Sequence, residues 1–193
     1  MMKMPYRALM TLVVGFAPAI SPAHAQQNVN CTSVITSGTF DNVNVPPNMP
    51  CTLEDSVRVQ GNITVGVNAS LDVEFIVVDG NIVANGAGLL VLDGVSVGQN
   101  VITNRLQIVR INQSVIYGNL GISGSSALVE LFPNTVNGNV NISNNNTAFG
   151  GGNTIAANTI GGNLVCTGNA PPPDNFGLTN AVSGQRVGQC AGL

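Results

Sequence analysis

Apolar residues recur along this chain in columns with a nearly constant period, about 19 residues long, as in repeat proteins. An Asn, preceded by Gly in most repeats, marks the register. The interval between neighbouring markers is almost constant and lengthens only at the last one. The markers are Asn42, Asn62, Asn81, Asn100, Asn119, Asn139 and Asn163. A period of this length without helical signals predicts a solenoid.

Three apolar columns keep a constant distance from the marker. Three positions before it lie Val59, Val78, Val97, Ile116, Val136 and Ile160. One position after it lie Val43, Ile63, Ile82, Val101, Leu120, Val140 and Leu164. Nine positions after it lie Leu71, Leu90, Val109 and Leu128. Polar residues or Gly separate these columns, as in half-buried strands, so the pattern predicts a triangular coil of three short strands and three turns.

The predicted fold is therefore all-β, a single parallel β-helix of about seven coils of roughly 19–24 residues. Crossovers between parallel strands are nearly always right-handed, and we expect a right-handed helix. Stacked Asn amides can donate and accept hydrogen bonds along the axis, so the marker column is expected to form a structural ladder. The Gly before it supplies either a positive φ or room for a close backbone approach.

Residues 1–25 have the pattern of a cleavable signal peptide. Lys3 and Arg7 precede an apolar stretch, residues 8–20, and Ala23-His24-Ala25 fits a cleavage site. The stretch is too short to span a bilayer, which takes about 20 residues. We therefore expect residues 1–25 to be removed and residues 26–193 to form one solenoid domain, without a transmembrane segment, that is secreted, periplasmic or at the cell surface.

Charge limits the partners of the predicted mature chain. Lys3 and His24 are the only lysine and histidine, and four Arg against nine Asp and Glu leave a formal charge of 4 − 9 = −5. Nucleic-acid binding needs clustered basic residues, so it is not expected. Without His or Lys the common nucleophile–base pairs cannot form, and we expect no cofactor.

Four cysteines in an exported chain indicate two disulfides rather than a metal site. Three pairings are possible, and the repeat register selects one of them. The interval from Cys31 to Cys51 is one repeat, and Cys190 lies 24 residues after Cys166 and follows a final Gly184-Gln185 step, so each pair lies on neighbouring coils. We therefore expect Cys31–Cys51 and Cys166–Cys190, one at each end.

Carboxylates and arginine are the remaining candidates for chemistry. Glu74 and Asp93 are one repeat apart and so stack in one column, while Asp72 and Arg110 share a neighbouring column. These four form one candidate patch, for acid–base work on carbohydrate or for holding Ca²⁺. A solvated face with spaced charges is the alternative, and no metal-loop signature accompanies the patch.

Two segments lengthen the last coils, residues 144–152 and residues 170–176. The second contains three consecutive prolines, which lack the backbone donor that a sheet interior needs. Both are expected to be exposed surface loops.

Three stretches carry a family resemblance: VPPNMPCTL at 45–53, GGNLVCTGNAPPP at 161–173 and SGQRVGQC at 183–190. With the repeated V-x-G-N-[VIL], they resemble a group of small exported bacterial β-solenoid proteins. The resemblance implies a right-handed β-helix of the pectin-lyase-like type and brings no activity or catalytic residues. The period is also similar to that of bactofilins, but a signal peptide and disulfides depart from those cytoplasmic filaments.

Together these observations favour a non-enzymatic structural or interaction module, with a carbohydrate or a surface protein as its partner. The alternative is a carbohydrate-binding or carbohydrate-active protein, lyase-like or hydrolase-like, that uses the acidic face.

Overall fold

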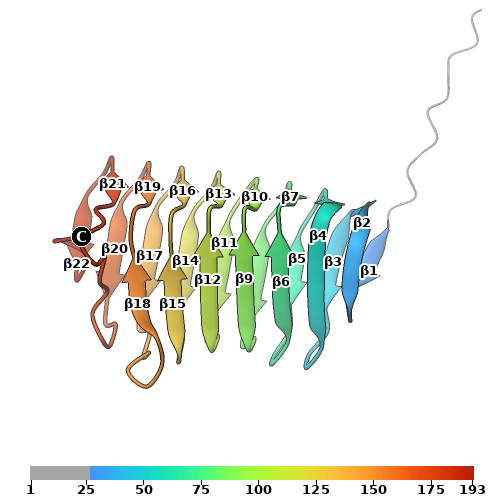
Figure 1. Ribbon diagram of the computed structural model, residues 1–193, viewed down its shortest axis with the longest axis horizontal. Coiled ribbons are helices and arrows are strands. Elements are labelled where there is room, and N and C mark those ends of the chain that lie inside the picture. Colours follow the sequence, from blue (N-terminus) through green and yellow to red (C-terminus); the bar gives the residue numbers. More distant parts are fainter. Residues whose placement is uncertain (1–26) are drawn as a thin grey trace, which may run out of the picture.

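The computed structural model describes residues 27–193, so the predicted signal peptide lies outside the described residues. These residues form 22 strands and no helix, and successive coils stack into a rod (Figure 1). All paired strands run parallel, as the repeat predicts. The all-β solenoid is therefore confirmed.

Each regular coil passes through three sheet surfaces, which we call faces A, B and C. Face A consists of β1 (Asn28–Asn30), β3 (Asn42–Val45), β5 (Ile63–Val65), β8 (Ile82–Asn85), β11 (Val101–Asn104), β14 (Leu120–Ser123), β17 (Val140–Ser143), β20 (Leu164–Thr167) and β22 (Arg186–Gly188). Face B consists of β2 (Val34–Phe40), β4 (Pro50–Val59), β6 (Ser70–Glu74), β9 (Leu89–Asp93), β12 (Ile108–Asn112), β15 (Leu128–Leu131) and β18 (Gly152–Ile155). Face C consists of β7 (Val77–Val78), β10 (Ser96–Val97), β13 (Val115–Ile116), β16 (Thr135–Val136), β19 (Thr159–Ile160) and β21 (Ala181–Val182). Strands β2 and β4 continue from face B into face C.

The nine strands of face A delimit about eight turns, one more than the repeat predicts. The additional turn lies at the start, where Asn28 pairs with Asn42 although the two are much less than one repeat apart. Because this coil is shorter than the regular period, the spacing of the Asn markers did not predict it.

The three predicted apolar columns line the inside of the rod. Val59, Ile63 and Leu71 have no exposed surface, and their counterparts in later coils are equally buried. Leu128 is also buried, but it lies outside the core cluster, because Val109 pairs with Val129 and not with Leu128. The turn before β15 contains one more residue than the turn before β12, which shifts the inward position by one. The prediction that Leu128 continues the inward column of Leu71, Leu90 and Val109 was therefore wrong.

The Asn markers form the predicted ladder along the turn between faces C and A. The Oδ1 of Asn62 accepts hydrogen bonds from the backbone N–H (2.9 Å) and the Nδ2 (3.0 Å) of Asn81. The same pattern joins Asn81 to Asn100 and Asn100 to Asn119. A Cβ on Gly118 would lie 2.6 Å from the carbonyl oxygen of Gln99, so the Gly is needed for close approach of the backbones.

Disulfides close both ends of the rod, with the predicted pairing. The Cα atoms of Cys31 and Cys51 are 5.4 Å apart, and those of Cys166 and Cys190 are 5.2 Å apart. All four side chains are buried in the core.

The two lengthened segments are only partly the surface loops that the sequence predicts. Phe149 is fully exposed, but Asn145 and Thr147, from the same segment, are buried. The second segment lies along face B, where Asp174 pairs with Thr154 of β18. It therefore covers the edge of the last strand of face B.

Candidate functional site

All four predicted patch residues lie on the outer surface of face B. Asp72 and Glu74 belong to β6, Asp93 to β9 and Arg110 to β12. They point outward because alternate residues of these strands are buried in the core. Their role in chemistry stays a prediction.

The register brings some of these residues together and separates others. Glu74 is directly paired with Asp93, which in turn pairs with Asn112. Asp72 and Arg110 share a column, but Val91 lies between them. Arg110 instead neighbours Glu130, with 3.6 Å between its Nε and the Glu130 Oε2. A count of 19 residues forward from Arg110 ends at Val129, so the extra residue before β15 hid this partner from sequence reasoning.

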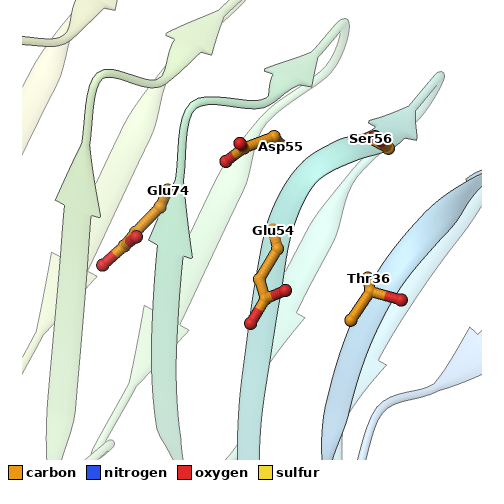
Figure 2. Close-up of a pocket in the computed structure, with 5 residues that line it drawn as sticks. All are labelled: Thr36, Glu54, Asp55, Ser56 and Glu74. Carbon is orange, nitrogen blue, oxygen red and sulfur yellow. The ribbon is translucent and has the colours of Figure 1, made fainter.

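A shallow groove of about 400 Å³ lies where β4 turns from face B to face C. It is lined by Thr36, Glu54, Asp55, Ser56 and Glu74 (Figure 2). Glu54 and Glu74 project from adjacent strands, and Asp55 lies at the bend of the chain. Sequence reasoning missed the contribution of Glu54 and Asp55.

The groove exists because β4 contains an extra residue. Leu53 pairs with Val73 and Arg58 with Val77, so five steps along β4 match four along the next coil. Such a bulge bends the strand and redirects its side chains. The slightly longer interval from Asn42 to Asn62, compared with that from Asn62 to Asn81, is the trace of this bulge in the sequence.

The side chain of Asp93 is incompletely hydrogen-bonded. One of its carboxylate oxygens is buried without a hydrogen-bond partner among residues 27–193, and the same holds for Asp72. In the next coil, Asn112 can donate to the carbonyl oxygens of Ile111 (3.0 Å) and Phe132 (2.9 Å). An amide satisfies this position, whereas a carboxylate leaves it unsatisfied.

A second, buried amide ladder lies inside the turn between faces B and C. The Oδ1 of Asn158 accepts from the backbone N–H (2.9 Å) and the Nδ2 (3.0 Å) of Asn134. The backbone N–H and the Nδ2 of Asn158 donate in turn to the Oδ1 of Asn180. Nδ2 atoms of the three residues also donate to the carbonyl oxygens of Ile111, Leu131 and Ile155.

A third ladder lies inside the turn between faces A and B. The Oδ1 of Asn169 accepts from the backbone N–H and the Nδ2 of Asn145, and Gln189 accepts from Asn169 in the same way. Sequence reasoning missed both buried ladders. Except for the last step, from Asn169 to Gln189, the intervals between their members match the lengths of the coils that they cross, and this match was the available signal.

No three His, Cys, Asp or Glu side chains between residues 27 and 193 are grouped closely enough to hold a metal ion.

In the part of the chain that the structure describes, no helix has the length and apolar character needed to cross a membrane.

Fold and side-chain geometry together define a parallel β-solenoid with a disulfide at each end. The chain matches no family model, no curated protein and no solved structure.

Proposed function

We propose that this chain is an exported structural or interaction module, a non-enzymatic β-solenoid that acts at the cell surface or outside the cell. The observation that carries the proposal is the direction of its polar contacts. Three amide ladders, two disulfides and two ion pairs all join one coil to the next. Such contacts stiffen a rod along its axis.

The arginine contacts follow the same direction. Arg58 donates to both carboxylate oxygens of Asp79 in the following coil, with Nη2–Oδ distances of 2.9 Å. The pair is largely exposed, so its contribution to stability is about 1 kcal/mol or less. In the proposed rod, the Arg58–Asp79 pair holds two neighbouring coils in register.

The disulfides support a location outside the cytoplasm, because such bonds persist in oxidising compartments. The predicted signal peptide and the resemblance to exported bacterial, pectin-lyase-like β-helices favour the same location. Fractionation of the source cells, with mass spectrometry of the mature N-terminus, tests this part. A chain retained in the cytoplasm with residues 1–25 attached would contradict it.

An activity screen tests the non-enzymatic part. Purified protein is incubated with acidic polysaccharides, with and without Ca²⁺, and we expect no turnover. Activity that is lost in both Glu74→Ala and Asp93→Ala, and kept in Glu130→Ala, would overturn the proposal. Glu130 is the matched control because it is an outward carboxylate of face B that lies outside the groove.

The second candidate is a carbohydrate-binding or carbohydrate-active protein, and the groove at β4 favours it. Three carboxylates and two hydroxyl side chains line one hollow there. Glu54→Gln and Asp55→Asn keep the shape of the groove and remove its charge. Calorimetric binding of an oligosaccharide that is lost in these variants, and kept in Glu130→Gln, would favour this candidate.

A further inference from the structure

Face A differs from the other two faces in having no charged residue in its strands before the last one. From β1 to β20 its strands contain no Asp, Glu, Lys or Arg, and Arg186 in β22 is the first charged residue within them. Face B carries the acidic groove and the Arg110–Glu130 pair, and face C carries Arg58 and Asp79. Copies of a chain with net negative charge repel each other least where face A meets face A.

The outer surface of face A carries a knob and an adjacent notch. Ile102 of β11 is 49% exposed. Its neighbour in the next coil is Gly121 of β14, which has no side chain. Hollows of about 500 Å³ and about 150 Å³ adjoin Gly121, and both are also bordered by Ile102 and Asn141.

Gly121 has no backbone reason to be glycine. It is not among the residues with positive φ, and a Cβ built on it would meet nothing within 4 Å. A glycine inside a strand costs about 0.5–1 kcal/mol relative to Ala. Glycine at such a position often marks the close approach of another chain or ligand.

The knob and the notch are complementary under a two-fold rotation. Consider an axis that runs along the strand direction, midway between β11 and β14, and lies between two facing copies. The rotation keeps the strand direction and exchanges neighbouring coils, so Ile102 of each copy lies over Gly121 of the other. The same operation sets Val83 over Asn141 and Thr64 over Val165, without opposing any two charges. Contacts of this reciprocal kind define an isologous dimer.

We infer that face A is a contact surface for a second copy of this chain, centred on Ile102 and Gly121. Nine strands at about 4.8 Å spacing and four residues in width give a face of about 500 Å² per copy, or about 1,000 Å² in total. This area is at the lower limit of specific interfaces, so the dimer is weak and forms at high local concentration. The inference rests on the proposed interaction role and names one partner for it.

Charge placed on the knob and in the notch tests this arrangement. Ile102→Glu and Gly121→Arg are made separately in the chain without residues 1–25, and each is followed by sedimentation from about 10 µM to 1 mM, a range suited to a weak interface. Each variant alone should weaken self-association at least about tenfold, because like charges approach across the axis. An equal mixture of the two should restore it, since the introduced carboxylate of one copy then faces the introduced guanidinium of the other.

Val77→Glu is the matched control, because Val77 is an exposed valine on face C. It should leave self-association within about twofold of the unchanged chain, as expected for a site outside the interface. Circular dichroism checks that every variant is folded. An unchanged chain that stays monomeric at the highest concentration, a mixture that fails to recover, or a control that dissociates would each overturn the inference. Self-association and polysaccharide turnover are measured separately, so the face A contact and the non-enzymatic role can fail independently.

Discussion

The N-terminal and C-terminal halves of the rod fill their turns in different ways. Inside the turn between faces B and C, Ile76 and Val95 occupy the first positions, whereas Asn134, Asn158 and Asn180 occupy the later ones. The turn between faces A and B changes in the same direction, from Ala87 and Leu106 to Asn145 and Asn169. One backbone path is therefore compatible with an apolar filling and with a buried amide ladder.

The change from one filling to the other occurs through serine. The backbone N–H of Ser114 donates to the Oδ1 of Asn134, and that of Ser125 donates to the Oδ1 of Asn145. Each serine thus lies between the last apolar filling and the first Asn, and its backbone N–H is the first donor of the ladder. An unpaired donor or acceptor of a buried amide costs stability, so a ladder needs a suitable residue in every coil that it crosses.

The largest expected effect comes from interrupting a ladder. Asn158→Ala should lower the free energy of unfolding by about 4 kcal/mol, because two buried donors of Asn134 lose their acceptor at about 1–3 kcal/mol each. Val95→Ala, at the same turn position in the N-terminal half, should lower it by about 2 kcal/mol through lost packing. Urea unfolding followed by circular dichroism measures both. Equal losses would mean that the ladder stabilises its turn no more than apolar packing does.

The two disulfides are expected to be nearly equivalent although their halves differ. They close loops of similar length, with sequence separations of 20 and 24, so replacing either pair by Ala should cost about 3 kcal/mol on the chain-entropy estimate. The midpoint of thermal unfolding under non-reducing conditions compares the double variants. A loss confined to one end would show that the stability of the rod depends on that end alone.

The smallest expected effect is a gain in stability on the acidic face. Asp93→Asn should raise the free energy of unfolding by about 1 kcal/mol, because an amide donor can replace an unpartnered buried oxygen and repulsion from Glu74 is removed. Asp79→Asn is the control and should have the opposite sign, since it weakens the contact with Arg58. Urea midpoints of the two variants provide the comparison. A destabilised Asp93→Asn protein would point to a partner for the carboxylate.

Much of the fold could be predicted because a stacked coil repeats its environment at a fixed interval. Val78 and Ile82 occupy the same place in their coil as Val97 and Val101 do in the next, so their period shows which residues point inward. The prediction failed where one residue was inserted, as before Leu128, because a single insertion reverses which side chains face the core. It also failed for Asn145, whose polar character suggested a surface loop.

The candidate site was less accessible to sequence reasoning. The column of Glu74 and Asp93 followed from the period, but Glu54 and Asp55 reach the same groove through a bulge that alters the register locally. Likewise Arg110 and Asp72 share a column, yet the strand between them leaves Arg110 beside Glu130. Proximity across coils depends on the number of intervening strands as well as on the column.

The sequence by itself determined the parallel solenoid, the outer ladder from Asn42 to Asn163 and the pairing of the cysteines. These features depend on position within a repeat, and the period contains that information. Only the tertiary structure decided that Asn134, Asn158 and Asn180 point inward, that a groove opens beside β4, and that Ile102 adjoins a notch at Gly121. Those features depend on turn geometry and side-chain direction, which vary from coil to coil while the period stays the same.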